Sequence, residues 1–158
     1  REKFITFTIR DYGWSQGRNS SQSDIDKVYE FSKKINSKLI IIPDDMKKLK
    51  NYNTYDVLIC ESARFNMNER IFLYGKSIVN INPQGGPSHI SILMKNSKVI
   101  IINFASDSFD GNPEYCKKHY GINYGEQPYL SLQTYLMWSG IYKNYKAEDL
   151  KKILKKIS

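Results

Sequence analysis

The stretch "INPQGGPSHISILMKNSKVIIINF", residues 81–104, decides the fold. A short apolar run enters it, and two glycines and two prolines interrupt that run. Apolar residues then recur at helical spacing, and a second apolar run closes the stretch. This order predicts a strand over 78–81, a helix over 86–96 and a further strand over 99–104. The helix is expected to face the sheet with Ile90, Leu93 and Met94.

The same alternation runs through the rest of the chain. Short apolar or alternating runs predict strands over 4–9, 38–42 and 55–60. Helical spacing predicts helices over 66–77 and 147–157, and another that begins at Ser23 as N-cap. Strands alternating with helices indicate a three-layer α/β, Rossmann-like domain with a mostly parallel sheet of about five strands. We expect one domain over 1–158, excised from a longer protein because the chain begins at Arg1.

Composition excludes several classes of protein. The 158 residues are 41% hydrophobic and carry a net charge of +8, but no apolar run approaches the length of a membrane span. The lysines are spread along the chain, without an arginine-rich arm or an aromatic and basic alternation, so we expect no nucleic-acid partner. Cys60 and Cys116 have no metal-ligand spacing and are interpreted as reduced thiols. The alternative is a catalytic pair of Cys116 with His119. The expected location is the cytoplasm, including the inner membrane surface.

The glycine turn "NPQGGPS", residues 82–88, falls at the carboxyl end of a predicted strand, where ligands bind in parallel α/β sheets. Pro87 suits the first helical position, and Gly85 and Gly86 permit close approach to the backbone. We expect free N–H groups of Ser88 and His89 to point outward and to favour a phosphate. The turn has neither the Walker ending nor the spacing Gly-x-Gly-x-x-Gly. A purely structural turn is the alternative.

A second informative stretch is "TIRDYGWSQGRNS", residues 8–20. Arg10 closes the first predicted strand, and Arg18 and Asn19 lie in the loop that follows. Strand-end arginines of a parallel sheet point toward the same rim as the glycine turn, and arginine forms bidentate hydrogen bonds to phosphate. The two arginines are therefore predicted to clamp a pyrophosphate. The alternative is that they form surface ion pairs with Asp11 or Asp24.

Three stretches carry a family resemblance. "GGPSHISILMKNSKVIIINF", residues 85–104, resembles the donor-binding half of GT-B glycosyltransferases, including heptosyltransferase-like enzymes. The order strand, Arg, loop, Arg-Asn, helix is similar to that of fucosyltransferase-like bacterial enzymes, in which arginine holds the donor diphosphate. "GINYGEQPYLSLQTYLMW", residues 121–138, resembles a segment of a bacterial glycosyltransferase-like group. A complete GT-B enzyme has two such domains, so the resemblance implies that this chain supplies one of them.

The resemblance implies a domain of polysaccharide biosynthesis that binds a nucleotide-sugar donor and transfers the sugar to a glycan or another acceptor. We expect the transfer to need no metal ion and no cofactor. The residues implied for the donor diphosphate are Arg10, Arg18, Asn19, Gly85, Gly86, Pro87, Ser88 and His89. Gln84 and Asp107 are candidates for ribose or sugar contacts. The catalytic base is Glu61, His89 or a residue of a missing N-terminal acceptor domain.

Two other functions stay open at this point. One is a non-catalytic Rossmann-like module that docks onto a partner or binds a glycan. Its motivation is an aromatic-rich segment over 115–145, since aromatic rings stack on sugars and fill interfaces. The other is a phosphate-processing enzyme of a different doubly wound class, although no nucleophile motif is present at a strand end.

Overall fold

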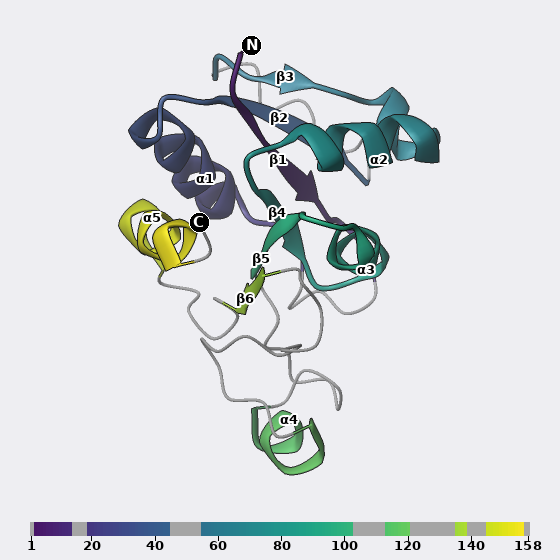
Figure 1. Ribbon diagram of the computed structural model, residues 1–158, viewed down its shortest axis with the longest axis vertical. Helices are drawn as coiled ribbons and strands as arrows, with labels where there is room; N and C mark the ends of the chain where they lie inside the picture. Colours follow the sequence, from purple (N-terminus) through teal and green to yellow (C-terminus); the bar gives the residue numbers. More distant parts are fainter. Residues whose placement is uncertain are drawn as a thin grey trace.

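The computed structural model describes residues 2–13, 19–44, 55–102, 113–120, 135–138 and 145–156. Its sheet has six parallel strands in the order β3-β2-β1-β4-β5-β6 (Figure 1). The strands are β1 Phe4–Ile9, β2 Lys38–Pro43, β3 Leu58–Ile59, β4 Asn80–Pro83, β5 Lys98–Ile102 and β6 Tyr135–Trp138. The helices are α1 Gln22–Lys34, the 3₁₀ helix η3 Ser62–Arg64, α2 Met67–Lys76, α3 Gly86–Leu93, α4 Pro113–Tyr120 and α5 Ala147–Lys156.

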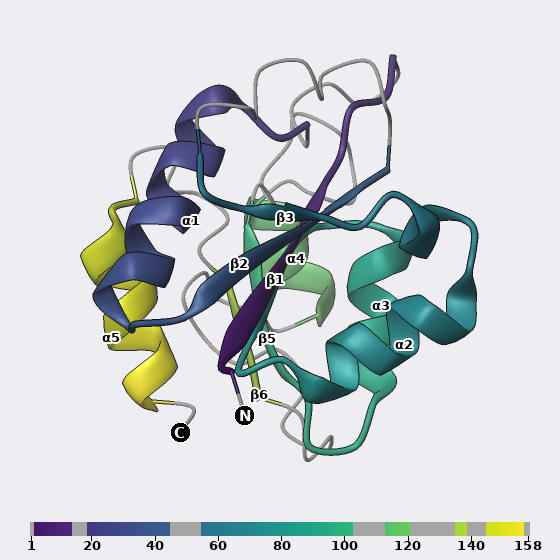
Figure 2. The ribbon, with the colours of Figure 1, turned by 90° about the horizontal axis from the view of Figure 1, so that it is seen from above.

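The predicted fold class is confirmed, because the sheet is parallel and has helices on both faces. Helices α1 and α5 cover one face, and α2 and α3 cover the other (Figure 2). The sheet has one strand more than expected: β6 lies within a region that was expected to be irregular. Among the described residues, no helix is both long and apolar enough to cross a membrane.

The strand order reverses direction beside β1. From β1 the chain moves outward to β2 and β3, then returns to pair β4 with the other side of β1. The connections on the two sides of this point lie on opposite faces of the sheet, so the carboxyl ends of β1 and β4 diverge into different loops. In doubly wound sheets this switch point is where ligands bind.

The sheet face under α1 and α5 is apolar. Residues Ile5, Phe7 and Ile9 of β1 are at most 1% exposed and pack with α1 and α5. The core on this side also contains Val28, Phe31, Leu39, Ile41, Ile81, Ile100, Ile102, Leu150 and Leu154. Burying side chains of this size stabilises a fold by about 1.5–3 kcal/mol each, so most of the hydrophobic stabilisation comes from this side.

The opposite face carries a buried polar layer, which we define as Thr6, Thr8, Tyr74, Asn80, Asn82 and Ser91. The Asn80 amide accepts from Thr6 Oγ1 at 2.5 Å and from Ser77 Oγ at 2.7 Å. It donates to the Tyr74 carbonyl at 3.0 Å and to Ser97 Oγ at 2.9 Å. All four hydrogen-bonding positions of this amide are therefore occupied, which is what allows it to be fully buried.

This polar layer changes which side of α3 is buried. Ser88, Ser91 and Ile92 face the sheet, whereas Leu93 is 75% exposed, so the expectation that Leu93 faces inward is wrong. The reason is that Asn82 Nδ2 donates to Ser91 Oγ at 2.9 Å, so α3 meets a polar partner. A helix packed on such a partner turns a serine inward instead of its leucine.

Several element boundaries also differ from expectation. Helix α1 begins after Ser21 and not Ser23: Ser21 and Asp24 form a reciprocal capping box, with Asp24 N–H donating to Ser21 Oγ at 3.2 Å. Strand β3 spans two residues where six were expected. Strand β4 begins two residues later than predicted, and its polar residues Asn80 and Asn82 are buried within the sheet.

Candidate functional site

Arg10 lies at the switch point, directly after β1. Its side chain is 5% exposed, and Nη1 donates to the Gln84 carbonyl at 3.2 Å, which joins the carboxyl ends of β1 and β4. The guanidinium also lies 4.9 Å from the centroid of the Tyr12 ring. The backbone of Arg10 is fixed in the same way, because its N–H donates to Ser20 Oγ and its carbonyl accepts from the Ser20 N–H. The cation is therefore held at a defined place on this rim.

The glycine turn lies against this guanidinium. Gly85 has a φ of 157°, and a Cβ at this position would lie 3.0 Å from Arg10 Nη1. Glycine is required here for two reasons. Another residue would be strained at this positive φ, and its Cβ would push the Arg10 guanidinium away. Gly86 has nothing within 4 Å of a Cβ position, so its lack of a side chain is not sterically required. Pro87 occupies the first turn of α3, as expected.

The outward N–H groups expected of Ser88 and His89 are not free, and that expectation is wrong. Both donate to the Gly85 carbonyl, at 3.1 and 3.3 Å. The Ser88 hydroxyl is 2.7 Å from the same carbonyl and 3.2 Å from the Gly85 nitrogen, so it holds the turn together. The Ser88 bond is a tight i to i−3 contact and uses an N–H group that an ordinary α-helix leaves open, whereas the His89 bond is the ordinary first i to i−4 bond of the helix. The amide of Gly86 is left as the backbone donor at this helix start.

The polar layer reaches this turn through an unbroken series of hydrogen bonds. Thr8 Oγ1 lies 2.7 Å from Tyr74 Oη, which donates to Asn82 Oδ1 at 3.4 Å. The amide of Asn82 contacts Ser91, whose hydroxyl donates to the Ser88 carbonyl at 2.9 Å. Burial raises the pKa of Tyr74 to about 12, which keeps its hydroxyl protonated. The position of the glycine turn is thus tied to the centre of the sheet.

The other predicted site residues are placed as follows. Asn19 closes the loop after β1: its amide accepts from the Tyr12 N–H at 3.0 Å and donates to the Tyr12 carbonyl at 2.8 Å. Arg18 and Asp107 lie outside the described residues. Glu61 and His89 are exposed, and no described contact fixes either side chain against the glycine turn. The structure thus brings Arg10, Gln84 and Gly85 together.

Sequence reasoning missed a buried ion pair on the same rim. Asp44 follows β2 directly and accepts from Arg70 Nη2 of α2 at 3.0 Å, and both side chains are at most 9% exposed. Arg70 Nε also donates to the Ala63 carbonyl at 2.8 Å. Burial raises the pKa of the Asp44 carboxyl, while the positive charges of Arg70, Arg64 and Arg10 oppose that shift. The sequence signal for such a pair is an acidic residue directly after a strand together with an arginine on a helix that follows later in the chain.

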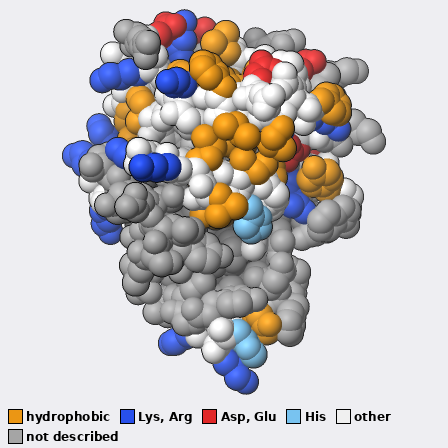
Figure 3. All heavy atoms as spheres, turned by 45° about the vertical axis from the view of Figure 1, so that its right-hand side comes forward, with side chains coloured by type: hydrophobic (Ala, Val, Ile, Leu, Met, Phe, Trp, Pro, Cys, Tyr) orange, Lys and Arg blue, Asp and Glu red, His pale blue; other side chains and the backbone are white. Residues whose placement is uncertain are grey.

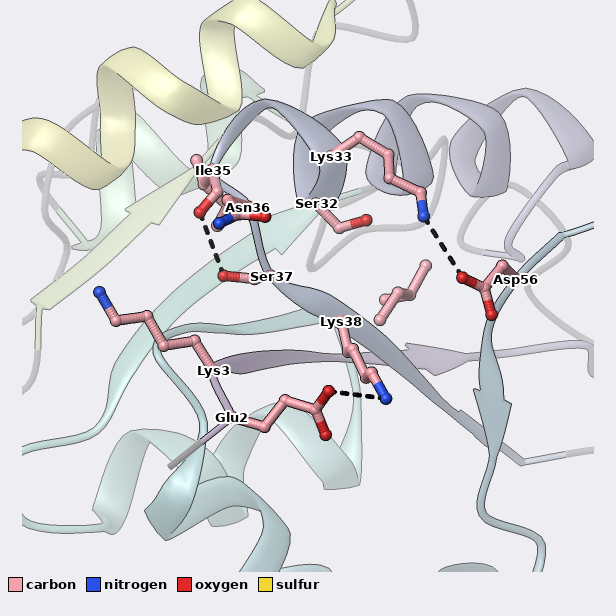
Figure 4. A pocket seen from close by; sticks show the side chains of 10 residues that line it. Glu2, Lys3, Ser32, Lys33, Ile35, Asn36, Ser37, Lys38 and Asp56 are labelled. Carbon is pink, nitrogen blue, oxygen red and sulfur yellow. Dashed lines mark hydrogen bonds and ion pairs between the residues drawn. The ribbon is translucent and has the colours of Figure 1, made fainter.

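A cavity of about 550 Å³ lies at the opposite end of the strands, beside the amino ends of β1 and β2 (Figure 4). Its charged side chains are largely matched: Lys38 pairs with Glu2 at 2.7 Å, and Lys33 pairs with Asp56 at 3.6 Å. Because this cavity lies at the amino ends of the strands, it is separate from the switch point at their carboxyl ends. Within the described ranges, no group of three or more His, Cys, Asp or Glu side chains could hold a metal ion.

Comparison with family models, with curated proteins and with solved structures finds no match to this chain. Function is therefore inferred from the chemistry of the site itself.

The glycine turn supports a matched test. Gly85→Ala is expected to lower the free energy of unfolding by about 1–3 kcal/mol, because the new Cβ meets Arg10 Nη1 and the backbone becomes strained. Gly86→Ala is the control, since open space surrounds that position. Urea denaturation of the two variants measures the difference. Equal stability of both variants would show that Gly85 does not constrain this site.

Proposed function

We propose that this domain binds the diphosphate of a nucleotide sugar at the switch point and serves as the donor-binding part of a metal-independent glycosyltransferase. The observation that carries the proposal is the buried Arg10 guanidinium, held between the carboxyl ends of β1 and β4 against a glycine turn. A fixed cation at that place is suited to an anionic ligand, and the net charge of +8 favours one as well.

In this proposal Arg10 stabilises the negative charge that grows on the leaving nucleoside diphosphate during sugar transfer. Fixed charges of this kind are the largest single contribution to catalysis in many enzymes. The Gly86 N–H at the start of α3 adds a neutral donor, and the Gln84 side chain contacts ribose or sugar hydroxyls. Glu61 and His89 stay candidates for the base that activates the acceptor, as does a second domain. The proposed acceptor is a glycan, and the proposed location is the cytoplasm or the inner membrane surface.

Ligand-induced thermal stabilisation tests this proposal. Melting is followed with UDP, GDP, ADP, CMP and inorganic pyrophosphate, and a ligand at 100 times its dissociation constant adds about 2.7 kcal/mol of stability. One nucleoside diphosphate is expected to raise the melting temperature. Arg10→Lys keeps the charge but loses the bidentate fork, so it is expected to weaken binding by about 1.5–3 kcal/mol.

The control is Lys95→Ala, which removes an exposed positive charge just beyond the other end of α3. Its binding should match that of the parent protein. Melting of each variant without ligand separates a loss of binding from a loss of folding. No stabilisation by any of the five ligands would refute the proposed donor site.

A second candidate function is a non-catalytic interaction module, and the exposed surface of α2 and its neighbours favours it. Figure 3 shows hydrophobic side chains grouped on the face that carries α2 and α3. The exposed apolar side chains of this region include Phe65, Met67, Ile71, Phe72 and Leu93, with Phe65 82% exposed. Clusters of this kind are typical of interaction sites. Binding of a glycan or a protein without any nucleotide binding would favour this function over the first.

A further inference from the structure

Tyr145 forms a buried hydrogen bond with a residue 121 positions earlier in the chain. It lies two residues before α5 and is 3% exposed, and its hydroxyl donates to Asp24 Oδ1 of α1 at 2.8 Å. Burial and the negative charge of Asp24 raise the pKa of Tyr145 above its ordinary value, so the hydroxyl stays protonated and donates. Helices α1 and α5 lie side by side (Figure 2), and this contact joins their first turns.

The Asp24 carboxylate carries this contact on to the start of α1. Its second oxygen, Oδ2, accepts from the N–H and from the hydroxyl of Ser21, both at 2.8 Å. Ser21 is the N-cap of α1, so the carboxylate fixes the backbone at the point where the helix begins. Hydrogen bonds to a charged acceptor are about twice as strong as bonds between neutral groups. The position of Ser21 therefore depends on a carboxylate that Tyr145 holds from the other side.

The residue before this N-cap is bonded to Arg10. The Ser20 N–H donates to the Arg10 carbonyl at 2.9 Å, and Ser20 Oγ accepts from the Arg10 N–H at 3.1 Å. Arg10 Nη1 in turn donates to the Gln84 carbonyl at 3.2 Å. Hydrogen bonds and one peptide link thus run from the start of α5 to the cation at the switch point. The buried members of this series, at most 5% exposed, are Tyr145, Asp24, Ser20 and Arg10.

We propose that Tyr145 is a positioning residue for Arg10, and that it acts through Asp24 and the two serines that precede α1. The docking of α5 and the binding of an anion at Arg10 then stabilise each other, because coupling between two sites is reciprocal in free energy. The effect on ligand binding rests on the proposed function, whereas the effect on the Arg10 backbone does not. Tyr145 belongs to the aromatic-rich segment that suggested glycan binding, but its hydroxyl is used inside the domain.

Amide hydrogen exchange of the protein without ligand tests the link to Arg10. The reporter is the Ser20 N–H, which donates to the Arg10 carbonyl, and the reference is the Ile41 N–H, which is buried in β2. Tyr145→Phe removes only the hydroxyl. It is expected to speed exchange at Ser20 about tenfold relative to Ile41, because the loss of this bond loosens the series locally.

Ile100→Val is the matched control, since it removes a methylene from the buried core at β5 and none of these hydrogen bonds. It lowers the stability of the whole fold, so exchange at Ser20 and at Ile41 should rise by the same factor. If Tyr145→Phe also speeds both amides equally, Tyr145 contributes to overall stability alone and its positioning role is overturned.

Calorimetric titration with inorganic pyrophosphate tests the effect on the proposed donor site. Tyr145→Phe is expected to lower the affinity about fivefold or more at a temperature at which the variant is folded, while Ile100→Val binds like the parent protein. An unchanged affinity of Tyr145→Phe would overturn the coupling to the ligand and leave the donor site standing. If the parent binds neither pyrophosphate nor a nucleoside diphosphate, the donor site is overturned, and exchange at Ser20 alone decides whether Tyr145 positions Arg10.

Discussion

Asp44→Ala is expected to lower the free energy of unfolding by about 3–5 kcal/mol, the usual cost of removing one partner of a buried ion pair. The variant leaves the Arg70 guanidinium buried without its carboxylate partner, although its hydrogen bond to the Ala63 carbonyl remains. In a domain of this size the melting temperature falls by about 2–4 °C for each kcal/mol. Urea denaturation and thermal melting both measure the loss.

The double variant Asp44→Ala/Arg70→Met is the control for Asp44→Ala. Replacing both partners removes the uncompensated charge and puts an apolar side chain in its place, which is often close to neutral for stability. The double variant should therefore be more stable than Asp44→Ala alone. If Asp44→Ala is as stable as the parent protein, the ion pair of Asp44 with Arg70 does not hold η3 to β2.

Asn80→Leu is expected to lower the free energy of unfolding by about 2–5 kcal/mol. The replacement leaves the hydroxyls of Thr6 and Ser97 without the amide that they contact, and each buried polar group without a partner costs about 1–3 kcal/mol. Leucine has the same branching at Cγ and the same number of side-chain heavy atoms as asparagine but a larger volume, so the cost combines the lost hydrogen bonds with overpacking of a buried site.

Ile81→Val is the comparison for Asn80→Leu, because Ile81 is the next residue and faces the apolar side of the sheet. It should cost about 0.5–1.5 kcal/mol, as expected for the loss of one buried methylene. Denaturation of the two variants in parallel shows whether the two faces of β4 differ. A cost for Asn80→Leu no larger than that for Ile81→Val would mean that the polar layer adds little to stability.

The apolar half of the structure could be predicted from the sequence. Runs such as Lys38–Pro43 and Lys98–Ile102 are strands because each is almost entirely aliphatic and ends at turn residues. The parallel topology then follows from their alternation with helices. It also places Arg10 and the glycine turn on one rim, because the carboxyl ends of parallel strands meet at the same edge.

The polar half could not be predicted in the same way. Asn80 and Asn82 look like solvent-facing or loop residues until Tyr74 and Ser91 are known to lie opposite them. Hydrophobic spacing predicts that Leu93 of α3 faces the sheet. It cannot predict the exposed position of Leu93, because it does not include the polarity of the sheet face that α3 packs on. The two-residue β3 is too short for any pattern to define its ends.

The candidate site was predicted in part for related reasons. Arg10, Gln84 and Gly85 belong to strand ends, and their meeting follows from topology. The ion pair of Asp44 with Arg70 joins residues 26 positions apart, and it depends on how α2 packs. The bond of the Ser88 N–H depends on the tightness of the first turn of α3, which the sequence does not specify, whereas the His89 N–H makes the ordinary first bond of a helix capped by Gly85.

The central place of β1 has a consequence for synthesis of the chain. Among the described strands β1 is made first, yet both its edges are paired: Phe4 lies opposite Lys38 of β2, and Thr6 lies opposite Asn80 of β4. On the ribosome, one edge of β1 therefore has no partner until the chain beyond residue 83 has emerged. An unpaired strand edge is prone to aggregation, and contacts between distant residues form slowly. The nascent chain thus exposes β1 for longest along the edge that later pairs with β4.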